Sequence, residues 1–173
     1  AAAMGTVMPD NTFYVDETIT HRGILQRHLQ NRGPQSYFRP QGGLGQGLGI
    51  ALGAKLAAKD RPVVLMIGDG AFMYNPVLQS LALSQHENLP IMVIVSNNNG
   101  YLAMKKEHEA FYPDGASSKN NLFYGEPITS LEYSEIPKLF GGYGRRVENA
   151  ADLTEALKEG LAAIESGRGA LIN

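Results

Sequence analysis

The sequence contains no cysteine, which excludes disulfide bonds and thiolate chemistry and fits a reducing cytoplasm. It also has no apolar run near the roughly 20 residues of a membrane-spanning helix. The net charge is −2 and no dense basic patch occurs, so we expect neither nucleic acid nor a membrane as a partner. The N-terminal Ala1-Ala2-Ala3-Met4 lacks the charged and apolar regions of a secretory signal, and we expect a cytoplasmic protein.

The usual fingerprints of nucleotide binding are also missing, although five glycines cluster between Gly42 and Gly49. A dinucleotide-binding loop needs glycines at positions i, i+2 and i+5, and every candidate pair in this cluster meets leucine or isoleucine at the third position. No Gly-Lys-Ser/Thr is present for a P-loop. A non-catalytic nucleotide-binding module of the Rossmann type is therefore kept only as an alternative. The clustering itself indicates close approach of the backbone to a ligand or to another helix.

The composition that is present favours one core-forming domain, spanning residues 1–173, with 43% hydrophobic and 18% charged residues. Continuous apolar runs at 63–67 and 91–95 are typical of parallel strands covered on both faces. Helical patterns alternate with such runs, which predicts an α/β three-layer sandwich with a mainly parallel central sheet. Predicted strands cover 12–15, 36–38, 63–67, 91–95, 144–147 and the residues from 170; predicted helices cover 21–29, 45–58, 76–85, 134–140 and 149–166; residues 112–127 are predicted to form a long loop.

Two predicted helices have a defined inward face. The apolar spacing of helix 45–58 predicts that one face buries Leu48, Ala51, Leu52 and Leu56. The next helix follows Asn75-Pro76, a pair typical of an N-cap and a first helical residue. Its predicted inward residues are Val77, Leu78, Leu81 and Ala82.

Polar residues follow two of the apolar strands directly. Gly68-Asp69-Gly70 comes after strand 63–67, and Asn97-Asn98 comes after strand 91–95, with 26 residues between Gly70 and Asn97. A carboxylate and an amide oxygen at neighbouring strand ends can ligate a hard cation. The glycines beside Asp69 allow backbone N–H groups to approach a phosphate. Open α/β sheets bind their ligands at this end of the strands.

Together these residues make the chain similar to a known family. It resembles the diphosphate-binding (PP) domain of thiamine-diphosphate enzymes, of the acetolactate synthase and benzoylformate decarboxylase type, over nearly its whole length. The resemblance rests on Asp16-Glu17-Thr18, Tyr37-Phe38, Gly42-Gly43-Leu44-Gly45, Gly68-Asp69-Gly70, Leu89-Pro90 and Asn97-Asn98. It implies a thiamine-diphosphate-binding fold and two cofactors, thiamine diphosphate and Mg²⁺.

The resemblance also implies roles for single residues. Asp69, the Asn98 side chain and the Gly100 carbonyl would ligate Mg²⁺, while the Gly70 and Ala71 amides would meet the diphosphate. Leu44 would support the cofactor in a bent shape, and the Gly42 carbonyl would accept from its aminopyrimidine. The implied cofactor-binding set is Ile19, Thr20, Gly42, Gly43, Leu44, Gly68, Gly70, Ala71, Asn98, Gly100 and Tyr101.

Some of these assignments stay open at this point. Asn97 could hold the loop while Asn98 binds the metal, or the register could be shifted by one residue. Tyr101 and Met104 could line the site or simply pack. His108 could reach a substrate, whereas His21, His28 and His86 are expected to be solvated. Ala71 stands where relatives often have serine, and Ile19 offers no hydroxyl to a phosphate.

The resemblance finally implies that the chain is half of an active site. The glutamate that activates the cofactor belongs to a pyrimidine-binding domain on the same or another subunit, and nothing here resembles that domain. We therefore expect a fragment of a longer chain, or the small subunit of a split keto-acid decarboxylase, that is inactive alone. The whole enzyme would be a homodimeric or homotetrameric lyase or transferase that decarboxylates or joins small 2-keto acids.

Overall fold

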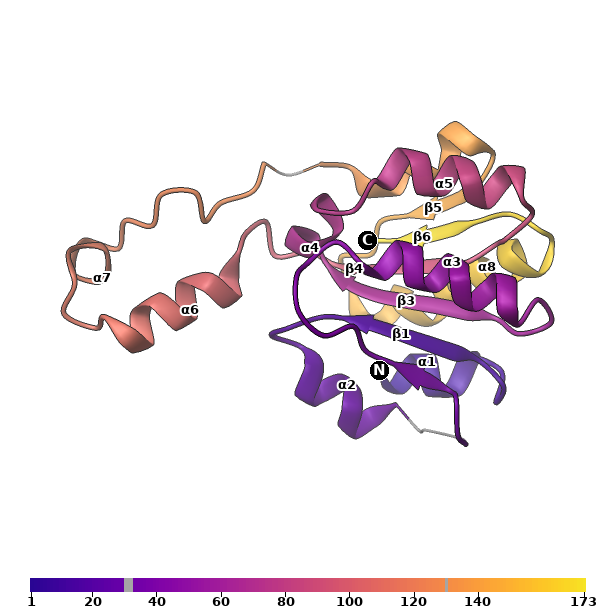
Figure 1. Ribbon diagram of the computed structural model, residues 1–173, viewed down its shortest axis with the longest axis horizontal. Helices are drawn as coiled ribbons and strands as arrows, with labels where there is room; N and C mark the ends of the chain where they lie inside the picture. Colours follow the sequence, from indigo (N-terminus) through magenta and orange to yellow (C-terminus); the bar gives the residue numbers. More distant parts are fainter. Residues whose placement is uncertain (30–32, 130) are drawn as a thin grey trace.

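The computed structural model describes residues 1–29, 33–129 and 131–173, and its centre is a parallel sheet (Figure 1). The strand order is β2-β1-β3-β4-β6-β5, and every registered strand pair is parallel. The predicted α/β fold is thus confirmed, with a sheet that is wholly rather than mainly parallel. The strands are β1 (Phe13–Glu17), β2 (Tyr37–Phe38), β3 (Val63–Gly68), β4 (Met92–Ser96), β5 (Tyr143–Arg145) and β6 (Ala170–Ile172).

Helices cover both faces of this sheet. They are α1 (Ala2–Val7), α2 (Arg22–His28), α3 (Gly47–Ala57), α4 (Asp69–Met73), α5 (Val77–His86), α6 (Leu102–Phe111), α7 (Ala116–Asn120), the 3₁₀ helix η1 (Tyr133–Phe140) and α8 (Ala150–Glu165). The short helices α1 and α4 were absent from the sequence prediction.

The alternation of side chains along β3 divides the core into two layers. Leu65 and Ile67 pack with α3, α4 and η1, whereas Val64 and Met66 pack with α1, α2 and α8. The two helix layers lie on opposite sides of the sheet in Figure 1. Because both faces of β3 are covered, its side chains can be apolar at every position, which explains the continuous apolar run.

The predicted inward faces of α3 and α5 are partly wrong. The buried face of α3 ends at Leu52, and Leu56 is 58% exposed. In α5, Leu78 is 51% exposed and Ala82 is exposed as well. The helix is turned so that two serines face inward, and the Ser84 hydroxyl donates to the Leu89 carbonyl over 2.8 Å. A pattern of apolar spacing gives no weight to such a polar contact.

The segment after β4 forms an arm that extends from the body (Figure 1). It contains α6 and α7, and neither helix has a buried residue. The predicted loop 112–127 is therefore wrong in part, because α7 lies within it. Among the described residues, no helix is long and apolar enough to cross a membrane.

Two glycine substitutions should change stability in opposite directions. A Cβ atom on Gly144 would lie 1.7 Å from the Ser134 carbonyl oxygen, so we expect Gly144→Ala to lower the free energy of unfolding by about 1–3 kcal/mol. Gly53 lies in α3, and a Cβ atom there would meet nothing within 4 Å. We therefore expect Gly53→Ala to raise the free energy of unfolding by about 0.5–1 kcal/mol. Urea unfolding followed by circular dichroism measures both. Equal effects of the two variants would contradict the close packing of β5 on η1.

Candidate functional site

Three neighbouring strands end at one edge of the sheet and place the candidate site there. Glu17 is the last residue of β1, Asp69 follows the last residue of β3, and Ser96 ends β4. Glu17 pairs with Ile67, and Gly68 pairs with Ser96. Parallel pairing in this register brings the polar residues beyond the strands together, as the sequence predicted.

Asp69 and Asn98 lie on either side of one backbone N–H group. The Gly100 amide donates to Asp69 Oδ2 and to Asn98 Oδ1, each over 3.1 Å. Asp69 is only 2% exposed. A buried carboxylate and an amide oxygen are therefore directed to the same place. These are the ligand types that a hard cation prefers.

Asn97 has a different environment from Asn98. Its Oδ1 accepts from the Asn99 amide over 2.9 Å, which closes a short turn. Asn97 lines a separate cavity on the other side of the loop, together with Asn99. The geometry thus favours Asn98 as the partner of Asp69 and Asn97 as the residue that holds the turn.

A cavity at the strand ends contains most of the predicted cofactor-binding residues. Its lining comes from the ends of β1, β3 and β4, the segment between β1 and α2, the glycine cluster, α4 and the segment that opens α6. Predicted residues in the lining are Ile19, Thr20, Leu44, Gly68, Asp69, Gly70, Ala71, Asn98, Gly100 and Tyr101. Residues in the lining that the sequence did not single out for this cavity include Glu17, Thr18, His21 and Ser96.

Gly42 and Gly43 line a neighbouring cavity instead of this one. That cavity also contains Glu17, Ile19 and Leu44, so the two spaces share one wall. Gly42 has φ +100, a left-handed conformation that favours glycine. Leu44 lines both cavities and is 39% exposed.

Two glycines near Asp69 and Asn98, Gly70 and Gly100, are required by protein contacts. A Cβ atom on Gly70 would lie 2.8 Å from the Tyr101 ring, and one on Gly100 would lie 2.5 Å from Glu126 Oε1. Tyr101 in turn contacts Tyr74, with the ring centroids 6.2 Å apart. Burial, with Tyr74 and Asp69 nearby, raises the pKa of Tyr101, so its phenol stays protonated at neutral pH. Tyr101 therefore both packs and lines the cavity.

Glu17 makes four side-chain hydrogen bonds at this edge, although no separate role was predicted for it. Its Oε1 accepts from the amides of Gly45 and Gln46, over 2.7 and 3.0 Å. Its Oε2 accepts from the Gly47 amide over 2.8 Å and from Asn75 Nδ2 over 3.3 Å. The available signal was an acidic residue at a strand end, preceding a glycine cluster whose amides need acceptors.

The predicted N-cap role of Asn75 is wrong, because Pro76 occupies the N-cap position of α5. The Asn75 side chain instead joins other elements of the site. Its Oδ1 accepts from the Leu48 amide over 3.1 Å, and its Nδ2 also donates to the Ala71 carbonyl over 2.9 Å. Asn75 therefore connects the start of α3 to α4.

The other carboxylate of β1 has separate partners. Asp16 is fully buried and accepts from the Thr18 amide over 2.9 Å, from the Thr18 hydroxyl over 2.6 Å and from the Tyr37 phenol. Burial and the hydrogen bond to Asp16 raise the pKa of Tyr37, so this phenol remains a donor. Asp16 thus links β1 to β2, while Glu17 faces the glycine cluster.

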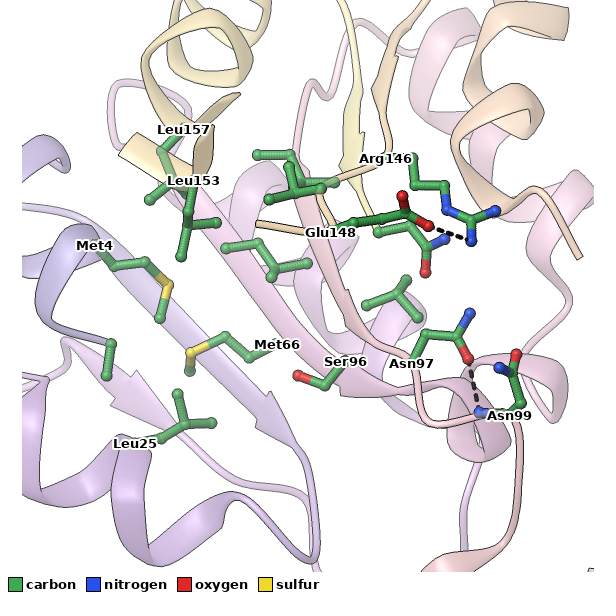
Figure 2. Close-up of a pocket in the computed structure, with 16 residues that line it drawn as sticks. Met4, Leu25, Met66, Ser96, Asn97, Asn99, Arg146, Glu148, Leu153 and Leu157 are labelled. Atoms are coloured by element: carbon green, nitrogen blue, oxygen red, sulfur yellow. Dashed lines mark hydrogen bonds and ion pairs between the residues drawn. The ribbon is translucent and has the colours of Figure 1, made fainter. Parts of the chain in front are cut away.

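A larger cavity of about 550 Å³ lies on the other side of the β4 end (Figure 2). Figure 2 shows Asn97 and Asn99 there, with Met4, Leu25 and Met66 across the cavity. Neither Asp69 nor Asn98 is among its lining residues. The larger of the two cavities is therefore not the one that contains the predicted cation ligands.

The histidines do not contribute to the predicted cation site. His28 and His86 are exposed, as expected. His21 is exposed too, at the margin of the Asp69 cavity. His108 lies on the arm against Tyr112 and Phe123, with ring centroids 5.4 and 5.6 Å away. It is not among the residues that line the Asp69 cavity.

The donor set fits a cation that is shared with a phosphate ligand. Within the described ranges, no group of three or more His, Cys, Asp or Glu residues could hold a metal ion. Mg²⁺ is commonly bound through one or two carboxylates together with substrate phosphates and water. Asp69 with Asn98 provides such a partial set.

Known proteins resemble both the sequence and this fold. The family model described as thiamine pyrophosphate enzyme, C-terminal TPP binding domain, matches residues 19–173. A probable acetolactate synthase large subunit of Methanococcus aeolicus is 31% identical over 160 residues, covering 87% of this chain and 24% of that protein. A sulfoacetaldehyde acetyltransferase of Alcaligenes xylosoxydans xylosoxydans is 29% identical over 140 residues, covering 80% of this chain and 22% of that protein.

A solved structure agrees with the sequence relatives. The thiamine diphosphate-dependent 4-hydroxybenzoylformate decarboxylase of Rhodococcus jostii RHA1 has a TM-score of 0.85 and 28% identity, covering 99% of this chain and 30% of that chain. The chain spans about a quarter of the length of the two curated relatives described above. The family match includes the glycine cluster, Asp69 and Asn98. The chain therefore belongs to the thiamine pyrophosphate enzymes and carries their C-terminal TPP binding domain.

Proposed function

We propose that this chain binds the diphosphate of thiamine diphosphate through Mg²⁺, as the PP half of a 2-keto acid decarboxylase or carboligase. The observation that carries the proposal is the convergence of Asp69 Oδ2 and Asn98 Oδ1 on one amide, at the carboxyl ends of parallel strands. The family match supports the choice of cofactor. Bound thiamine diphosphate supplies the chemistry that breaks or forms the bond beside a keto-acid carbonyl.

The chain's own residues would bind and orient that cofactor. Asp69, Asn98 and the Gly100 carbonyl would hold Mg²⁺, and the amides of Gly70 and Ala71 would meet the diphosphate. Asp69 is buried, so its charge would act on the cation with little competition from water. Leu44, which projects between the two cavities, would support the central part of the cofactor.

The remaining parts of the active site would come from outside this domain. Relatives are several times longer than the chain, which supports a pyrimidine-binding domain on the same or another subunit as the partner. We propose a homodimeric or homotetrameric cytoplasmic enzyme. The chain would be either a segment of such an enzyme or the small subunit of a split one.

Calorimetry of the chain tests the cofactor assignment directly. We expect saturable binding of thiamine diphosphate with Mg²⁺ and a loss of affinity of at least about tenfold, or about 1.4 kcal/mol, when EDTA removes the metal. NAD serves as the control, because the glycine spacing does not match a dinucleotide-binding loop. Tight NAD binding would replace this proposal by the nucleotide-binding alternative. Turnover of 2-keto acids by the chain alone would contradict the half-site assignment.

A further inference from the structure

Glu17 is hydrogen-bonded to the segment that directly follows Leu44. The side chain is 6% exposed, and its two oxygens accept from three consecutive amides, those of Gly45, Gln46 and Gly47. Hydrogen bonds to a carboxylate are stronger than those between neutral groups. The carboxylate also lies at the positive end of α3, where negative charge is favoured. The contact thus joins the end of β1 to the glycine cluster.

The packing around this contact leaves no space for a side chain at Gly45 or Gly47. A Cβ atom on Gly47 would lie 2.6 Å from Glu17 Oε2, and one on Gly45 would lie 2.6 Å from the Tyr74 carbonyl oxygen. Gly45 also has φ +91, which side chains disfavour. The glycines therefore admit the carboxylate from one side and the α4–α5 connection from the other.

Asn75 extends the same network to the metal loop. It donates to Glu17 and to the Ala71 carbonyl, and it accepts from the Leu48 amide. Glu17 and Asn75 together bind the start of α3 to α4, the helix that begins with Asp69. Supporting hydrogen bonds of this kind determine how accurately binding groups are placed.

We propose that Glu17 is a positioning residue that sets Leu44 relative to Asp69, so that the cavity between them is formed before the cofactor binds. The proposal rests on the proposed function for its ligand. Glu17 itself needs no contact with the cofactor, because both of its oxygens are used by the protein. Loss of the carboxylate would therefore weaken the binding of a ligand that contacts Leu44. It would leave unchanged the binding of a ligand that contacts only the residues around Asp69.

The test compares two ligands in Glu17→Gln and in the matched variant Asp16→Asn. Asp16 is also a buried carboxylate of β1, but it contacts Thr18 and Tyr37 rather than the glycine cluster. We expect Glu17→Gln to increase the Kd of thiamine diphosphate with Mg²⁺ about tenfold or more, and to leave the Kd of inorganic diphosphate with Mg²⁺ within about twofold. Hydrogen exchange by NMR should become at least about tenfold faster at the amides of residues 45–47. Asp16→Asn should leave these amides protected.

A second variant keeps the proposal testable if Glu17→Gln does not fold. Gly47→Ala retains the charge and displaces the carboxylate, so it should show the same separation between the two ligands. Equal weakening of both ligands, or unchanged exchange at residues 45–47, would overturn the positioning role. A wild-type chain that binds neither ligand would instead overturn the proposed function. If Glu17→Gln and Gly47→Ala both bind thiamine diphosphate with the affinity of the wild type, the positioning role of Glu17 is refuted and the proposed function stands.

Discussion

Replacing Asp69 with alanine should weaken Mg²⁺-dependent binding of thiamine diphosphate by at least about 100-fold, or about 2.8 kcal/mol. Asp69 is the charged member of the proposed ligand set, and it is only 2% exposed, so its removal takes away a buried negative charge beside the cation. The fold should survive the change, because the Gly100 amide still has Asn98 Oδ1 as an acceptor. Isothermal titration of wild type and variant at matched Mg²⁺ concentrations measures the loss.

Two asparagine variants supply the control for this experiment and decide whether Asn98 or Asn97 is the proposed cation ligand. Asn98→Ala should weaken cofactor binding about tenfold, since it removes a neutral ligand. Asn97→Ala should change the affinity much less, because that side chain closes a turn on the other side of β4. A greater loss in Asn97→Ala than in Asn98→Ala would show that the assignment is shifted by one residue. Unchanged binding in Asp69→Ala would refute the cation site.

Replacing Phe72 with alanine should lower the free energy of unfolding by about 3–5 kcal/mol. Phe72 is fully buried in the core layer that contains α3. It meets the buried Tyr133 edge to face, with the ring centroids 5.5 Å apart. Truncation would leave a cavity between η1 and α4, the helix that begins with Asp69. Urea unfolding of the two proteins measures the difference.

The adjacent residue offers a matched control. Met73 belongs to the same short helix but is 46% exposed, so Met73→Ala should change the free energy of unfolding by less than about 0.5 kcal/mol. A loss below about 1 kcal/mol in Phe72→Ala would mean that α4 is not anchored in the core. The placement of Asp69 would then need another explanation.

The features that the sequence could predict are those encoded by short-range patterns. The apolar runs of β3 and β4 are long and are bounded by polar residues, so both strands and the edge at which Asp69 and Asn98 meet followed directly. Helix α4 has only five residues, too few for a periodic pattern. Nothing in the local sequence shows that α5 is turned to bury Ser84.

Contacts between distant residues account for the main omission at the site. Glu17 and Gly47 are 30 positions apart, and Glu17 and Asn75 are 58 apart. Asn75-Pro76 has a good local explanation as a helix start, and the tertiary contact to Glu17 overrides it. Asn97 and Asn98 are likewise separated by a turn of the backbone, which directs them to different cavities and has no counterpart in the spacing of the sequence.

The arm that carries α6 and α7 begins and ends at nearly the same point. Gly100 pairs with Pro127, and the Tyr101 amide donates to the Glu126 carbonyl over 2.8 Å. For a flexible loop closed at its base, doubling the length adds only about 0.6 kcal/mol of closure entropy. Insertions or deletions in the arm are therefore thermodynamically inexpensive for the sheet. This segment can diversify in length while Asp69 and Asn98 keep their geometry.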